Sequence, residues 1–119
     1  MSGPDTRGDV FTLADGTQLA LDEKGYLLDW QSWSRAVAVE WAARDGLTLE
    51  DDHWAVIDLL RDYYGEYEIA PPMRALLKLL RARLGDAALG SRELYRLFPE
   101  GPAKQACRYA GLPRPVSCI

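Results

Sequence analysis

The hydrophobic pattern of the chain changes its period near residue 29. Before that point, apolar residues alternate with polar ones on both sides of an Asp15-Gly16 pair; they are Phe11, Leu13, Leu19 and Leu21. Alternation with a period of two is typical of a strand, and Asp-Gly between two such runs is typical of a tight turn with positive φ at both central residues. The pattern predicts a hairpin over residues 10–21, after a polar, disordered segment over residues 1–8.

From Asp29 onward, apolar residues recur every three or four positions, which is the period of a helix with one buried face. Together with glycine and proline punctuation, this period predicts five helices, over residues 29–44, 49–70, 73–84, 92–98 and 103–110. Thr48 and Ser91 are the expected caps of the second and fourth helices, and Gly85 is expected to end the third. Gly101-Pro102 is expected to open the fifth helix, and Gly111 is expected to stop it. The expected core positions are Trp33, Trp41, Trp54, Ile57, Leu60, Leu77 and Leu80.

Length and composition fit a single globular domain over residues 1–119. Apolar residues make up 48% of the chain and charged residues 27%, and a chain of this length can bury a core without metals or disulfides. The expected fold class is mainly α. We expect a small orthogonal helical bundle with a helix-turn-helix-like core, an N-terminal β-hairpin and a mobile C-terminal arm over residues 112–119.

The net charge of −4 argues against a dedicated nucleic-acid binder, which normally presents a basic face. The helix-turn-helix order keeps a DNA-binding regulator as an alternative of another class, although the acidic run Glu50-Asp51-Asp52 would face the phosphates. No apolar run approaches the roughly 20 residues that a membrane span needs, so no membrane insertion is expected. The N-terminal sequence lacks the order of a signal peptide, so a cytoplasmic location is expected.

Most residues that could take part in catalysis or metal binding have an ordinary structural explanation. His53 is the only histidine, and with two distant cysteines it forms no usual metal-ligand spacing, so neither a metal nor a cofactor is expected. We expect His53 to pack or to cap near a helix start. Tyr63, Tyr64 and Tyr67 are expected to line the core or its rim.

The two cysteines are the strongest candidates for chemistry. Cys107 shares a helical face with Lys104 and is followed by Arg108, and nearby cations stabilise a thiolate. The helix dipole opposes that effect, because Cys107 lies toward the end of its helix. Cys118 is one residue from the C-terminus, beside Arg114, on a segment whose glycine and prolines disfavour a helix.

The spacing of the two thiols allows them to meet. They are 11 residues apart, and closing such a loop costs on the order of 2 kcal/mol, which one S–S bond overcomes under oxidising conditions. The pair is typical of a mobile thiol that visits partners and a fixed thiol that resolves it. The alternative is a buried Cys107 and an incidental terminal Cys118.

The ending LFPEGPAKQACRYAGLPRPVSCI resembles the signature of the DsrC/TusE family of sulfur-carrier proteins, as do GYLLDW, DHWAVIDLLRDYY and EIAPPMRALLK upstream. The resemblance covers roughly residues 8–119. It implies a helical fold with a hairpin and a flexible arm. It also implies that Cys118 carries a persulfide, so the word enzyme applies only in the sulfurtransferase sense. Arg114 replaces the usual lysine, and Val116-Ser117 replace Thr-Gly, which bears on the flexibility of the arm.

The resemblance further implies the partners. Members with a second cysteine, here Cys107, are the DsrC proteins that act as co-substrate of dissimilatory sulfite reductase. They hold sulfur as a Cys118/Cys107 trisulfide that a membrane-bound thiol reductase complex reduces. The alternative within the family is a TusE-like sulfur donor for tRNA 2-thiouridine synthesis. In both cases sulfur comes from relay proteins resembling DsrEFH or TusBCD.

Overall fold

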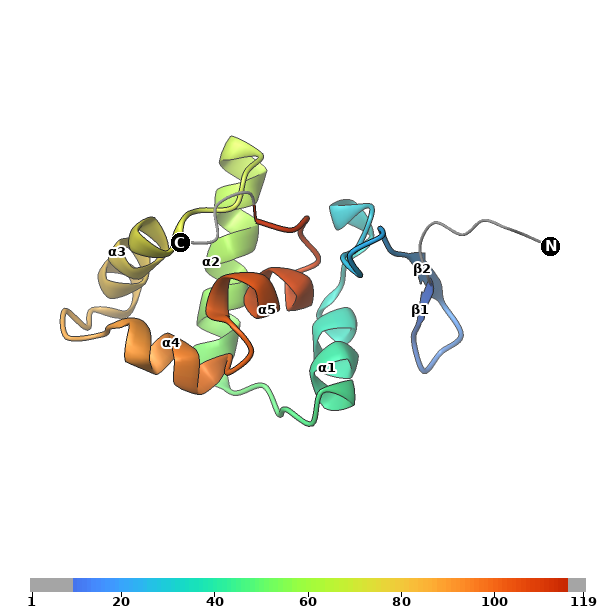
Figure 1. Ribbon diagram of the computed structural model, residues 1–119, viewed down its shortest axis with the longest axis horizontal. Helices are drawn as coiled ribbons and strands as arrows, with labels where there is room; N and C mark the ends of the chain where they lie inside the picture. Colours follow the sequence, from blue (N-terminus) through green and yellow to red (C-terminus); the bar gives the residue numbers. More distant parts are fainter. Residues whose placement is uncertain (1–9, 116–119) are drawn as a thin grey trace.

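The computed structural model describes residues 10–115 as a helical bundle with a hairpin at one side (Figure 1). Its elements are β1 (Val10–Thr12), β2 (Gln18–Ala20), a 3-10 turn η1 (Trp30–Ser32), α1 (Arg35–Arg44), α2 (Asp51–Tyr67), α3 (Met73–Leu84), α4 (Ser91–Leu97) and α5 (Pro102–Tyr109). The expected fold class, a mainly helical domain with an N-terminal hairpin, is confirmed. The segment predicted to be disordered, residues 1–8, lies outside the described residues.

The hairpin forms where it was predicted, but its turn differs. β1 and β2 are antiparallel, with Phe11 opposite Leu19, and both of these side chains are buried. The loop is longer than two residues, because the N–H of Leu13 donates to the carbonyl of Thr17. Only Gly16 has positive φ, at 93°, so the turn is not the tight form expected from Asp-Gly.

The first predicted helix, over residues 29–44, is interrupted. η1 precedes α1, and between them Trp33 and Ser34 have extended backbones. The indole Nε1 of Trp33 donates to the carbonyl of Tyr109, 2.7 Å away. This bond to the end of α5 holds Trp33 out of the helical path, so a tertiary contact overrides the local helical pattern.

The start of α2 also differs from the prediction. The helix begins at Asp51 after Glu50, whereas Thr48 was the expected cap. The N–H of Glu50 donates to Nδ1 of His53 at 3.0 Å, and Nε2 of His53 lies 2.9 Å from the carbonyl oxygen of Leu97. Since His53 uses both ring nitrogens and is 4% exposed, the prediction of a capping and packing role is confirmed.

The later helices follow the glycine and proline signals closely. α3 ends at Gly85, whose φ is +68°, and α5 opens with Pro102 in its first turn. α4 begins at Ser91 itself, while Gly90 is the cap and donates its N–H to Oε1 of Glu93 at 3.2 Å. The boundaries at Gly85 and Pro102 were predictable because they depend on local backbone preferences, whereas the expected cap at Ser91 was wrong by one residue.

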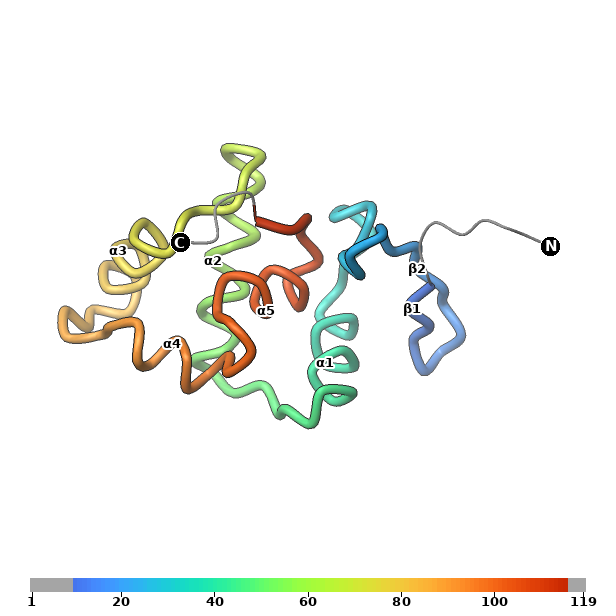
Figure 2. Tube along the Cα trace, in the orientation of Figure 1, coloured from blue at the N-terminus to red at the C-terminus, as the bar shows by residue number. Residues whose placement is uncertain are grey.

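The core is partly the predicted one. Trp41, Ile57, Leu60 and Leu80 are buried, but Trp33, Trp54 and Leu77 are only half-buried, and Leu76 occupies the core position assigned to Leu77. Trp54 lies at the rim under the guanidinium of Arg35, 3.9 Å from its ring centroid. The prediction missed the contribution of the C-terminal third, which buries Leu94, Leu97, Phe98, Ala106, Tyr109, Ala110 and Leu112. α5 therefore lies in the centre of the bundle, in contact with α1, α2 and α4 (Figure 2).

Candidate functional site

The predicted carrier thiol, Cys118, lies outside the described residues, so the structure places the other thiol and the base of the arm. The helix that carries Cys107 is followed by Gly111 and then by the arm. Leu112 and Pro115, in the described part of the arm, are buried. The base of the arm is therefore packed against the bundle. The mobility expected for residues 112–119 stays a prediction.

Cys107 is buried in the centre of the bundle. Its side chain is 1% exposed. Burial raises the pKa of the Cys107 thiol to about 12, because a thiolate loses the solvation of water inside an apolar core. In this arrangement Cys107 is a neutral, inaccessible thiol. A buried Cys107 was part of the alternative interpretation of the sequence.

The three predicted supporting cations do not form one cluster. Lys104 is exposed on α5, whereas Cys107 is buried. The guanidinium of Arg108 lies over the ring of Tyr26, 5.2 Å from its centroid. Arg114 is exposed and lines a small cavity at the end of α2. Because burial raises the pKa of Cys107, the expected stabilisation of its thiolate by Lys104 and Arg108 does not determine its state here.

A clamp that the sequence did not reveal holds the junction between α5 and the arm. Nη1 of Arg61 donates to the carbonyl of Trp30 at 3.1 Å and to that of Ala110 at 2.8 Å. The guanidinium also stacks on Trp33, 4.1 Å from its centroid. Since Trp33 itself binds the carbonyl of Tyr109, two side chains cap the last carbonyl groups of α5.

Gly111 completes this clamp. Its φ of +73° turns the chain away from α5, and a Cβ there would lie 2.5 Å from Cδ1 of Trp33. Only glycine fits a position where the backbone is left-handed and an indole touches the Cα. The clamp of Arg61, Trp33 and Gly111 thus determines the direction in which the arm leaves the bundle. Of its members, Gly111 was expected as the end of a helix and Trp33 as a core residue, whereas Arg61 had no sequence signal.

Buried polar side chains hold α5 in place at its other face. The hydroxyl of Tyr109 donates to Oδ2 of Asp45 at 2.7 Å and accepts from Nε2 of Gln105 at 2.8 Å. Oε1 of Gln105 accepts from the N–H of Glu100. Burial, with the hydrogen bond to Asp45 as a second cause, raises the pKa of Tyr109. This network ties Tyr109 to the end of α1, so it and the clamp together hold the C-terminal end of the helix that carries Cys107.

Over residues 10–115, no three His, Cys, Asp or Glu side chains gather closely enough to hold a metal ion. None of the helices in the same range is long and apolar enough to cross a membrane. Asp51 and Asp52 are exposed in the first turn of α2, where the helix dipole favours negative charge.

Comparisons with known proteins point to one family. The family described as DsrC like protein matches residues 13–119. Sulfurtransferase TusE of Sodalis glossinidius is 48% identical over 105 residues, covering 88% of this chain and 97% of that protein. Sulfurtransferase TusE of Escherichia coli K12 is 44% identical over the same length, covering 88% and 96%.

Solved structures agree with the fold. The NMR structure of DsrC from Allochromatium vinosum superposes with a TM-score of 0.84 at 48% identity, covering 94% of this chain and 99% of that one. The oxidised gamma-subunit of dissimilatory sulfite reductase (DsrC) from Archaeoglobus fulgidus gives a TM-score of 0.79 at 38% identity, covering 93% and 100%. The fold, with its central α5 followed by the carboxyl-terminal arm, agrees with these matches. The chain belongs to the DsrC-like family of sulfur-relay proteins.

Proposed function

We propose that this sulfur-relay carrier of the DsrC/TusE kind loads persulfide sulfur on Cys118 and passes it on in a TusE-type relay. The observation that carries the proposal is the burial of Cys107, which is 1% exposed and has a pKa raised to about 12. A thiol in that state neither attacks a donor nor meets a partner. Of the two cysteines in the chain, Cys118 is then the one left for the transfer.

The transfer is a thiolate displacement. The Cys118 thiolate attacks the outer sulfur of a donor persulfide, a new S–S bond forms, and the S–S bond of the donor breaks. The donor leaves as a thiolate, and Cys118 becomes a persulfide without any net oxidation. In the next step an acceptor takes the outer sulfur and restores the Cys118 thiolate.

The similarity to relatives named TusE supports the TusE-type destination, which in this family is tRNA 2-thiouridine synthesis. A second candidate is the DsrC role beside dissimilatory sulfite reductase. The presence of Cys107 and the likeness to the gamma-subunit from Archaeoglobus fulgidus favour it. That role uses a Cys118/Cys107 trisulfide, so α5 would have to expose Cys107 first.

The carrier assignment is tested by loading the full chain from a persulfide donor and measuring its intact mass. Wild type and Cys107→Ser should each gain about 32 Da, one sulfur atom, whereas Cys118→Ser should gain none. Loading of Cys118→Ser to the wild-type level would contradict the assignment of the carrier.

The destination is tested separately with Cys107→Ala. In a TusE-type relay, this variant should restore tRNA 2-thiouridine to cells that lack their own TusE as well as the wild type does. If wild type fails to restore it, while a trisulfide forms with dissimilatory sulfite reductase and disappears in Cys107→Ala, the second candidate is correct.

A further inference from the structure

A groove lies between α3 and the start of α4. Its volume is about 730 Å³, and the lining residues are Pro72, Met73, Arg74, Ala75, Leu77, Lys78, Arg81 and Ser91. That volume is in the range of sites that bind a ligand or a partner side-chain cluster. The proposed sulfur transfer does not use this groove.

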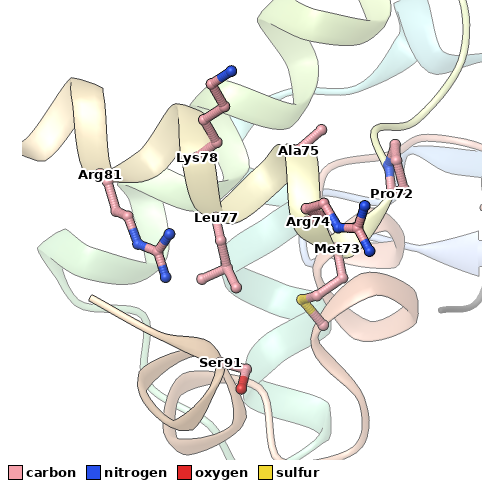
Figure 3. Close-up of a pocket in the computed structure, with 8 residues that line it drawn as sticks. All are labelled: Pro72, Met73, Arg74, Ala75, Leu77, Lys78, Arg81 and Ser91. Atoms are coloured by element: carbon pink, nitrogen blue, oxygen red, sulfur yellow. The ribbon is translucent and has the colours of Figure 1, made fainter. Parts of the chain in front are cut away.

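One stripe of α3 forms its floor. Met73, Leu77 and Arg81 follow one another at intervals of four residues, and their side chains point to the side of Ser91, whereas Lys78 points away from it (Figure 3). Met73 and Leu77 are only half-buried, so apolar surface in the groove remains in contact with solvent. Nε of Arg81 donates to the carbonyl of Leu89 at 2.6 Å, which holds its guanidinium at one end of the stripe.

The charge of α3 is unusual in this acidic chain. The helix sequence MRALLKLLRARL contains four cations and no carboxylate, although the whole chain has a net charge of −4. Of these cations, Arg83 forms an ion pair with Asp62. Within residues 10–115, Arg74, Lys78 and Arg81 form no ion pair. The groove therefore combines half-buried apolar side chains with cations that form no ion pair within the described residues.

The groove is also close to the base of the arm. Met73 lines both the groove and a smaller cavity at the start of α5, together with Gly101 and Pro102. Ala70, two residues before the groove begins at Pro72, lines the cavity that contains Pro113 and Arg114 of the arm. A protein seated in the groove would consequently lie beside the segment that leads to Cys118.

We propose that this α3–α4 groove binds an acidic amphipathic helix of a partner protein. The stripe from Met73 to Arg81 is about 12 Å long, which matches roughly two turns of a helix. An apolar face on the partner would cover Met73 and Leu77, and carboxylates beside it would pair with the groove cations. Nucleic acid fits less well, because its phosphates would lie against the apolar floor. The site goes beyond the sulfur chemistry, so binding is measurable on unloaded protein.

The test is an NMR titration of the unloaded, isotopically labelled full chain. The probe is a synthetic helical peptide with leucines on one face and glutamates beside them. Amide shift changes should concentrate at residues 73–81 and at Ser91. Arg74→Glu should weaken binding about tenfold, since it replaces attraction by repulsion. The matched control Lys24→Glu makes the same charge change in the loop after β2, which lies on the hairpin side of the molecule, away from α3 (Figure 1), and should bind as wild type does.

Two further probes separate the alternatives. A peptide of the same composition with its leucines scattered around the helix should bind poorly, and Leu77→Gln, verified as folded by circular dichroism, should weaken the original peptide. Equal binding of both peptides would mean simple charge attraction and would overturn the proposal. Shift changes outside the groove would overturn it too, as would displacement of the peptide by single-stranded oligothymidylate at physiological salt.

Discussion

Replacing Gly111 by alanine tests the clamp at the base of the arm. The first cost is conformational, since a φ of +73° is unfavourable for an L-residue by about 1–2 kcal/mol. The second is steric. The new Cβ would lie 2.5 Å from Cδ1 and 2.9 Å from Cβ of Trp33, so the indole has to move. Such a shift weakens the hydrogen bond from Trp33 to the carbonyl of Tyr109, which contributes about 1 kcal/mol. It also weakens the stacking of the Trp33 ring against the guanidinium of Arg61.

We therefore expect Gly111→Ala to lower the free energy of unfolding by about 3 kcal/mol, measured by urea denaturation at neutral pH. Gly85→Ala is the matched control, because Gly85 has a φ of +68° and a Cβ there meets nothing within 4 Å. This control has the conformational cost alone, about 1–2 kcal/mol. Equal losses for the two variants would refute the steric argument and, with it, the clamp.

Three further predictions concern the interior. The first uses the Cys118→Ser variant at pH 8, in which iodoacetamide should alkylate Cys107 of the native protein roughly a thousandfold more slowly than Cys107 of the urea-unfolded protein. The reason is that burial raises the pKa of Cys107 from 9.0 to about 12. Similar rates would mean that the thiol is accessible. The second concerns pH. As the pH rises from 9.0 toward 12, the thiol of the unfolded chain loses its proton before that of the native protein, so the free energy of unfolding should fall. The fall should be less steep in Cys107→Ala. In urea denaturation, Trp41→Ala should lower the free energy of unfolding by about 3–5 kcal/mol, because Trp41 is 7% exposed and stacks on Phe11. Trp54 is only half-buried, so Trp54→Ala should lower it by about half as much. The reverse order would contradict the assigned core.

Elements bounded by glycine or proline could be predicted from the sequence. α3 ends at Gly85 and α5 begins with Pro102 as expected, because these residues act on the backbone at their own positions. The hairpin was predictable for the same reason, through the alternation around Asp15-Gly16. The assignment of individual faces was less secure, as the exchange of Leu76 for Leu77 in the core shows.

Two of the errors lie where distant segments meet. The break between η1 and α1 follows from a bond between Trp33 and Tyr109, which are 76 positions apart. The start of α2 follows from His53, whose ring is held by the carbonyl of Leu97 at the end of α4. A local pattern contains no information about which distant carbonyl group will be near.

The sequence by itself determined the two thiols, their spacing of 11 residues and the proline-containing segment between them. Only the tertiary structure decided that Cys107 is buried and that Arg61 and Trp33 cap the end of α5. Burial depends on what packs around a side chain, and the acceptors of this clamp are backbone carbonyls. Because every residue has the same carbonyl group, the positions of these acceptors leave no mark in the sequence.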